Sequence, residues 1–214
     1  MASVRVTAVV MAGGEGRRLA LNVEKPMVKV VGKPMVQWVL EALSASSKVS
    51  EVFVVVSAHT SKTKRFVKGM GFNVLEAPGL SYVEDLKYVV TELNLASTLT
   101  ASADLPQLTS EVVNVVVNSY KLAGKPALTV VAPVEDYEGL GVKPRYKVNV
   151  KGVLATPIGV NVVNGHLVSL PTLEQEYLLL KLKPPLINVN TLNELKLAKN
   201  FMRQGLRVKL VKCA

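Results

Sequence analysis

Short valine-rich apolar runs alternate with helical patterns along most of the chain, and this alternation restricts the fold more than any other feature. Runs of this length that are apolar throughout are typical of strands buried on both faces of a sheet. Strands that alternate with amphipathic helices indicate a mostly parallel sheet with helices on both sides. The expected strands are 4–11, 51–57, 72–76, 98–103, 127–132 and 186–189, and the expected helices are 35–46, 62–70, 82–93, 110–122 and 192–204. The sequence therefore predicts an α/β fold that binds its ligands beyond the carboxyl ends of the strands.

A single domain is expected over residues 1–214, because this length suffices for one substantial core and nothing in the sequence suggests a second. The segment 139–171 departs from the alternation. Its runs at 148–153 and 158–163 indicate extended strands, which we expect to form a small lobe over the cleft.

A glycine-rich turn follows the first expected strand and is the strongest sign of a binding site. Glycine has no Cβ, so such a turn can bring backbone N–H groups against an anion, and Arg18 and Lys25 add positive charge nearby. The spacing fits neither the Walker pattern nor the complete dinucleotide fingerprint. A merely flexible turn is the alternative, but the basic residues beside it favour a phosphate site.

Two later apolar runs are followed by side chains that carry oxygen ligands. Asp104 follows the run 99–103 and precedes a Leu-Pro pair, where a carboxylate is well placed to hold Mg²⁺ against phosphate oxygens; a helix cap or turn residue is the alternative. Asn188 and Asn190 flank Val189, so on an extended chain both amides project to the same side. The pair can complete a metal or phosphate shell, although Asn190 also suits a helix cap.

Other polar residues point to structural roles. Glu84 and Asp85 open a helical pattern, where acidic side chains favour the positive end of the helix dipole. His59 and His166 are isolated and lack the spacing of a metal site.

Lysine and arginine outnumber aspartate and glutamate by 26 to 16, which gives a net charge of +10. A chain this basic is expected to bind an anionic partner. Aromatic residues make up only 5% and no nucleic-acid motif is present, so no nucleic acid is expected; a basic nucleic-acid-binding module is the non-enzymatic alternative. No run reaches the length of a membrane span, no secretory signal is seen, and the one cysteine, Cys213, excludes an internal disulfide. We expect a cytoplasmic protein, and a homodimer is compatible with the sequence.

The glycine-rich region resembles the signature of nucleotidyltransferases that attach an NMP to a phosphorylated acceptor. The matching residues are Gly13-Gly14-Glu15-Gly16-Arg17-Arg18-Leu19, Glu24-Lys25-Pro26 and Gly32-Lys33-Pro34-Met35, and segments 57–63, 79–86, 102–105, 159–163 and 188–191 agree in order and spacing. Within that superfamily the chain is most similar to the archaeal adenosylcobinamide-phosphate guanylyltransferases. The resemblance implies a Rossmann-like three-layer fold and transfer of GMP from GTP to adenosylcobinamide phosphate, a corrinoid, which gives adenosylcobinamide-GDP and pyrophosphate.

The resemblance also implies roles for individual residues. Arg18, Lys25 and Asp104 are the expected catalytic residues: the two cations stabilise the leaving pyrophosphate, and Asp104 holds Mg²⁺ with Asn188 and Asn190. The expected nucleotide-binding residues are Ala12, Gly13, Gly14, Gly16, Arg17, Ser57 and Gly79, and the expected acceptor-binding residues are Gly159 and Asn161. Arg17 stands where the wider family has threonine. Its side chain could contact a phosphate or point into solvent, and the sequence does not decide between the two.

Three related readings compete with this one. A molybdenum-cofactor guanylyltransferase fits the glycine turn and the Asp104-Leu105-Pro106 segment as well. A sugar-phosphate nucleotidylyltransferase ranks third, because 214 residues are few for one. A catalytically dead relative that only binds nucleotide is disfavoured by the intact set of Gly13, Arg18, Lys25 and Asp104.

Overall fold

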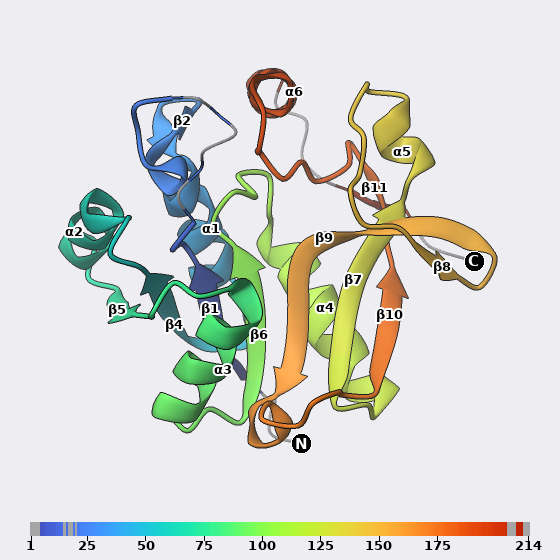
Figure 1. The fold of residues 1–214 in the computed structure, drawn as a ribbon. Coiled ribbons are helices and arrows are strands. Elements are labelled where there is room, and N and C mark those ends of the chain that lie inside the picture. Colours follow the sequence, from blue (N-terminus) through green and yellow to red (C-terminus); the bar gives the residue numbers. More distant parts are fainter. Residues whose placement is uncertain (1–4, 15, 17–18, 20, 205–208, 212–214) are drawn as a thin grey trace.

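The computed structural model describes residues 5–14, 16, 19, 21–204 and 209–211. Within this part of the chain, eight strands form one sheet: β1 (Val6–Met11), β4 (Val49–Val56), β5 (Asn73–Glu76), β6 (Ser97–Ser102), β7 (Ala127–Pro133), β8 (Val148–Val150), β9 (Val153–Asn164) and β10 (Gln175–Leu179). Their spatial order is β10-β7-β9-β6-β1-β4-β5, and β8 pairs with β9 at one end (Figure 1). Two smaller ribbons pair β2 (Lys29–Val30) with β3 (Lys33–Pro34), and β11 (Lys181–Lys183) with β12 (Lys209–Val211).

The sheet is mostly parallel, as the sequence predicts. β1 lies parallel to β4 and β6, β4 to β5, and β7 to β10. β9 is inserted antiparallel between β6 and β7. The predicted α/β class is therefore confirmed.

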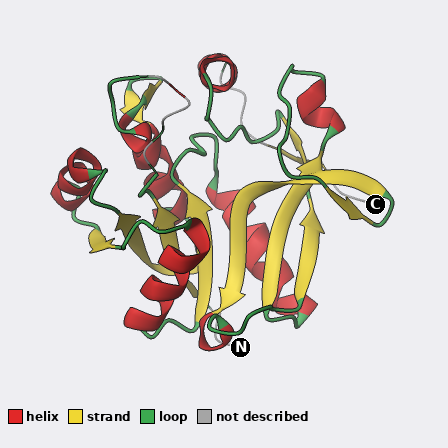
Figure 2. Cartoon of the chain, in the orientation of Figure 1, coloured by secondary structure: helices red, strands yellow, loops and turns green. Residues whose placement is uncertain are grey.

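Helices cover both faces of the sheet and make three layers (Figure 2). The helices are α1 (Met35–Ser44), α2 (Ser61–Gly69), α3 (Tyr82–Glu92), α4 (Ser110–Ala123), α5 (Glu135–Glu138) and α6 (Leu192–Arg203), and the 3-10 turns are η2 (Lys25–Met27) and η3 (Gly165–Leu167). Side chains alternate along β1, so Ala8 and Val10 join the core with α1 and α4, whereas Val9 joins the core under α3. None of the described helices is long and apolar enough to cross a membrane.

Three helices begin where the sequence predicts, because a hydroxyl side chain caps each of them. Ser81, Thr109 and Thr191 precede the first residues of α3, α4 and α6. Their hydroxyl oxygens accept backbone N–H groups three residues further on, at 3.2, 3.4 and 3.3 Å respectively. Such caps satisfy N–H groups that have no partner inside the helix.

The prediction of a strand at 186–189 is wrong. The segment is buried, but its backbone bonds go to a loop: the N–H of Ile187 donates to Gln107 Oε1 at 3.3 Å and that of Val189 to the Asp104 carbonyl at 3.0 Å. A buried irregular segment and a buried strand have the same apolar sequence pattern, because burial alone sets it. The backbone bond at Val189 ties this segment directly to Asp104.

The lobe predicted at 139–171 is only partly correct. β8 and the start of β9 do form an antiparallel hairpin, but the predicted strand 158–163 lies inside β9, in the middle of the main sheet. β9 is 12 residues long and continues past the hairpin, so its second half pairs with both β6 and β7. The edge strand β10, half-buried and polar at its start, was not predicted.

Candidate active site

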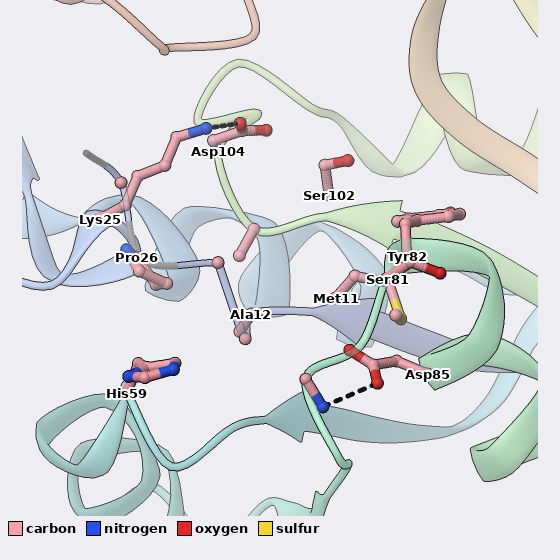
Figure 3. A pocket seen from close by; sticks show the side chains of 15 residues that line it. Met11, Ala12, Lys25, Pro26, His59, Ser81, Tyr82, Asp85, Ser102 and Asp104 are labelled. Atoms are coloured by element: carbon pink, nitrogen blue, oxygen red, sulfur yellow. Dashed lines mark hydrogen bonds and ion pairs between the residues drawn. The ribbon is translucent and has the colours of Figure 1, made fainter. Parts of the chain in front are cut away.

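A cavity of about 430 Å³ lies at the carboxyl ends of β1 and β6 (Figure 3). This is the end of the sheet where the sequence predicts ligands. Its lining residues are Met11, Ala12, Gly13, Gly14, Gly16, Lys25, Pro26, His59, Gly79, Ser81, Tyr82, Asp85, Ser102, Ala103 and Asp104. We call this the first cavity.

Three glycines of the turn line the first cavity, and two of them, Gly13 and Gly16, lie close to neighbouring segments. A Cβ on Gly13 would lie 3.3 Å from the Ser57 Cβ, and the Ser57 hydroxyl donates to the Gly13 carbonyl at 2.7 Å. Gly16 has φ +69°, and a Cβ there would lie 2.6 Å from the Lys25 Cβ. The sequence needs glycine at position 16, because any side chain would displace Lys25. A Cβ on Gly14, which lines the cavity, would meet none of the described residues within 4 Å.

Lys25, Asp104, Asn188 and Asn190 meet at one side of the first cavity, and we call them the central cluster. The Lys25 ammonium forms an ion pair with Asp104 Oδ2 and donates to Asn190 Oδ1 at 2.7 Å. The Asn188 amide nitrogen donates to Asp104 Oδ1 at 3.3 Å. Four residues separated by up to 165 positions, all predicted as site residues, are thus brought into contact.

The oxygen donors of the central cluster suit a magnesium ion. The described residues contain no group of three His, Cys, Asp or Glu side chains that could hold a metal. Mg²⁺ commonly uses one or two carboxylates and completes its shell with water and substrate phosphates. The carboxylate of Asp104 and the amide oxygen of Asn190, which share the Lys25 ammonium, match that requirement, whereas Asn188 presents its amide nitrogen to Asp104.

Glu24 fixes the backbone next to Lys25. Its carboxylate accepts the N–H groups of Lys62 and Thr63 at 2.8 and 2.7 Å and the Thr63 hydroxyl at 2.7 Å, and so caps the start of α2. Burial acts to raise the pKa of Glu24, but the hydrogen bonds from Thr63 and Lys62 outweigh it, and the pKa is lowered. The motif containing Glu24 was recognised in the sequence, but this contact was not predicted, because the two segments are 38 or more positions apart.

The turn before α3 forms another wall of the first cavity. Gly79 has φ +78°, and its N–H donates to Asp85 Oδ1 at 2.9 Å. Asp85 lies in the first turn of α3, as predicted, but it also lines the cavity, which was not predicted. His59, for which no role was predicted, is another lining residue. The sequence signal that could have indicated this contact is the position of the Asp85 carboxylate, six residues after Gly79 in a turn.

The two predicted acceptor residues lie on β9. A Cβ on Gly159 would lie 2.8 Å from Asn188 Nδ2 and 2.9 Å from Ser102 Oγ, so glycine here leaves room for the Asn188 side chain. The Asn161 amide donates at 3.4 Å to the hydroxyl of Tyr82, which lines the first cavity. The Tyr82 residue is 41% exposed, but its hydroxyl end is enclosed, and this burial raises the pKa of Tyr82.

A second cavity of about 290 Å³ adjoins the central cluster. Its lining residues are Tyr137, Val142, Lys143, Pro144, Arg145, Tyr146, Thr156, Pro157, Ile187, Asn188, Asn190, Thr191 and Glu194. Asn188 and Asn190 therefore belong to the wall of this cavity and also contact Asp104 and Lys25 of the first. Gly159 and Asn161 are not among the lining residues. The predicted residues Arg17 and Arg18 lie outside the described part of the chain.

A glycine turn, a lysine and an aspartate at the carboxyl ends of a parallel sheet form a site suited to the phosphates of a nucleotide. The chain belongs to the family of MobA-like NTP transferase domains, whose model matches residues 8–196.

Individual relatives agree with the family. The chain is 29% identical to the adenosylcobinamide-phosphate guanylyltransferase of Methanocaldococcus jannaschii over 210 residues, which cover 92% of this chain and 97% of that protein. It is 27% identical to a probable molybdenum cofactor guanylyltransferase of Thermococcus gammatolerans over 118 residues, which cover 55% of this chain and 58% of that one. The fold is similar to that of a CMP:2-keto-3-deoxy-manno-octonic acid synthetase complexed with CTP, with a TM-score of 0.73, 16% identity and coverage of 94% and 100%.

Proposed function

We propose that this nucleotidyltransferase transfers GMP from GTP to a phosphorylated corrinoid, adenosylcobinamide phosphate. The products are adenosylcobinamide-GDP and pyrophosphate. One observation carries the proposal: the central cluster lies between two cavities, with Lys25 and Asp104 on the wall of the first and Asn188 and Asn190 on the wall of the second. A transferase that joins a nucleotide to a second phosphorylated molecule needs two pockets that meet at the reacting atoms. The similarity to the Methanocaldococcus jannaschii enzyme over nearly the whole of both chains supports this choice of substrates.

The acceptor needs little chemical activation. A phosphomonoester oxygen is already ionised at neutral pH and attacks the α-phosphorus of GTP, while the bond from that phosphorus to the bridging oxygen breaks and pyrophosphate leaves. The protein's contribution is to align the two reactants and to neutralise the charge on the phosphates. This agrees with a site made of glycine backbone, a lysine, an aspartate and amides.

The glycines, Lys25 and Asp104 of the first cavity then have defined roles. The backbone N–H groups of Gly13, Gly14 and Gly16 bind the triphosphate, and the Lys25 ammonium, together with Arg18, stabilises the leaving pyrophosphate. Asp104, with the amide oxygens of Asn188 and Asn190, would hold Mg²⁺, which supplies positive charge to the phosphate oxygens. In the structure Lys25 pairs with Asp104, so the ammonium is held beside the carboxylate before any nucleotide binds.

The second cavity would receive the acceptor. Lys143 and Arg145 are exposed on its wall and suit the acceptor's phosphate, while Val142, Pro144 and Pro157 offer apolar surface to its body. Gly159 contributes by leaving space for Asn188 at the junction of the two cavities.

The direct test begins with calorimetric titration of the purified chain with GTP, ATP, CTP and UTP, with and without Mg²⁺. Selective binding of GTP is expected, followed by pyrophosphate release only when adenosylcobinamide phosphate is added. Pyrophosphate release with molybdopterin as the acceptor, and none with the corrinoid, would move the assignment to a molybdenum-cofactor guanylyltransferase. Absence of binding to every nucleotide would contradict the proposal.

A further inference from the structure

The turn between Gly79 and Asp85 presents a carboxylate to the first cavity. Asp85 is 8% exposed and lines the cavity. Its Oδ1 atom accepts two successive backbone N–H groups, from Gly79 at 2.9 Å and from Leu80 at 3.3 Å. Figure 3 shows the contact with Gly79 as a dashed line and the other carboxylate oxygen turned into the cavity. The two backbone contacts therefore orient the carboxylate.

The second oxygen, Oδ2, is the part of Asp85 that remains for a ligand. Within the described ranges no hydrogen bond to Oδ2 is found, whereas Oδ1 is occupied twice. Oδ2 faces the open cavity, so a ligand that covers it removes it from water, which is costly unless the ligand donates a hydrogen bond to it. A ligand that binds along this wall of the cavity must therefore offer N–H or O–H donors to Oδ2.

The position of Asp85 suits the base of a nucleotide. The glycine turn and the Lys25–Asp104 pair, which suit phosphates, also line the first cavity, and Figure 3 shows that pair on the opposite side of the cavity from Asp85. A nucleotide with its phosphates at Lys25 and Asp104 would direct its base toward Asp85. Guanine carries two adjacent donors on its pairing edge, the N1–H and the 2-amino group. Adenine has an acceptor at N1 and no 2-amino group.

We propose that Oδ2 of Asp85 accepts hydrogen bonds from the N1–H and the 2-amino group of guanine and so determines the selection of GTP. This inference rests on the guanylyl transfer proposed above and names the residue responsible for its nucleotide specificity. Adenine would place its N1 lone pair against the carboxylate and leave Oδ2 without a donor. A site built to accept a donor rejects a ligand that lacks it, because its own buried group is then unpaired.

The orientation of Asp85 makes a sharp test available. In an Asp85→Asn variant, the amide oxygen is expected to keep the two backbone bonds from Gly79 and Leu80, because only an acceptor can make them. The amide nitrogen then faces the cavity as a donor. This donor is opposed by both donors of guanine, whereas in xanthine it is opposed only by N1–H and can donate to the C2 carbonyl that replaces the 2-amino group. The substitution should therefore exchange the preferred base.

The experiment is calorimetric titration of the full chain and its variants with GTP, xanthosine triphosphate and ATP in the presence of Mg²⁺. The wild type should prefer GTP. In Asp85→Asn the GTP affinity should fall about a hundredfold, and xanthosine triphosphate should become the tighter ligand. Glu84→Gln is the matched control, because Glu84 is the exposed neighbouring carboxylate of the same helix turn and does not line the cavity. Its affinity for GTP should equal that of the wild type.

Exchange of the base cannot come from damage to the turn, so a gain for xanthosine triphosphate separates recognition from structure. Equal losses for both triphosphates in Asp85→Asn would overturn the inference and leave Asp85 as a residue that only holds the turn. An unchanged preference for GTP would overturn it as well, while leaving the guanylyltransferase assignment intact. A wild type without preference for GTP contradicts the proposed function itself, before any variant is made.

Discussion

The first and second cavities meet at the central cluster, but they are built from different kinds of structure. The first is formed largely by turns at the carboxyl ends of parallel strands, where the sheet fixes the backbone. The second is formed by the loop after α5, by β9 and by the irregular segment before α6. Loops accept changes in sequence more readily than sheets do. The comparison indicates that the first cavity, the proposed nucleotide end, is the part that the sheet fixes, whereas the second cavity, the proposed acceptor end, is the part that can be adapted to a different substrate.

The largest expected effect is at the junction of the two cavities. Asp104→Asn removes the carboxylate that pairs with Lys25 and would hold Mg²⁺. Turnover should fall by about a thousandfold or more, because electrostatic groups at developing charge contribute several kcal/mol to catalysis. Pyrophosphate release measures this loss, and thermal unfolding checks that the variant is folded. A kcat/KM within tenfold of the wild type would remove Asp104 from the catalytic site.

Gly159→Ala tests whether the two cavities depend on one shared contact. The new Cβ would lie 2.8 Å from Asn188 Nδ2 at a backbone φ of +79°, so Asn188 must shift. A kcat reduction of about ten- to a hundredfold is expected, which corresponds to roughly 1.4–2.7 kcal/mol.

Gly152→Ala separates displacement of Asn188 from backbone strain. Gly152, in the β8–β9 turn, has φ +85° and nothing within 4 Å of an added Cβ. It therefore carries similar strain without a clash. If Gly152→Ala reduces kcat as much as Gly159→Ala does, then strain alone explains the loss and the shared contact is unimportant.

A smaller effect, confined to the acceptor, is expected at the second cavity. Replacing both Lys143 and Arg145 by alanine removes two exposed cations from its wall. The KM for the acceptor should rise about tenfold, since partly exposed charges contribute about 1 kcal/mol, while the affinity for GTP stays unchanged. Lys147→Ala is the control, because Lys147 pairs with Glu138 at 3.0 Å and does not line the cavity. A weaker affinity for GTP in the double variant would mean that the two cavities are not separate sites.

The two cavities also differ in how far the sequence predicts them. The proposed nucleotide end can be predicted from local sequence patterns. Each apolar strand there is followed directly by a glycine turn, a carboxylate or a small polar residue. Gly13, Lys25 and Asp104 were therefore found from the sequence, as were most strands of the sheet. The four members of the central cluster were all predicted as site residues and lie in contact, although the segment carrying Asn188 and Asn190 is not a strand.

What the sequence did not predict depends on contacts between distant segments. The second cavity joins positions 137–146 to 187–194, and no local pattern indicates that these meet. The same holds for Glu24, whose partners are on α2, and for the place of β9 in the centre of the sheet. Asp85 was recognised as a helix-start residue, but its second role requires the fold of the turn at Gly79.

The smallest expected effect on turnover concerns Glu24, which supports the nucleotide end from outside the cavity. Glu24→Gln keeps one acceptor oxygen for the start of α2 but loses the charge that strengthens its bonds to Lys62 and Thr63. Lys25 should be less well positioned, with a kcat reduction of a few fold, and the free energy of unfolding at pH 7 should fall by about 1 kcal/mol. Glu76→Gln is the control: it removes a carboxylate that pairs with the Lys64 side chain of the same helix but does not cap the N–H groups of Lys62 and Thr63, so both values should stay near those of the wild type.

The pH dependence of stability identifies the Glu24 charge as the cause. The pKa of Glu24 is lowered from 4.5 in the folded protein, so its stabilisation is fully present above the pKa of the unfolded chain and is lost as pH falls through the folded pKa. Unfolding of the wild type and of Glu24→Gln, measured from pH 7 down to below the folded pKa, should therefore converge at the acidic end. A stability difference that stays constant over the whole range would assign the effect to the shape of the glutamine side chain rather than to charge, and the nucleotide end would then not depend on an ionised Glu24.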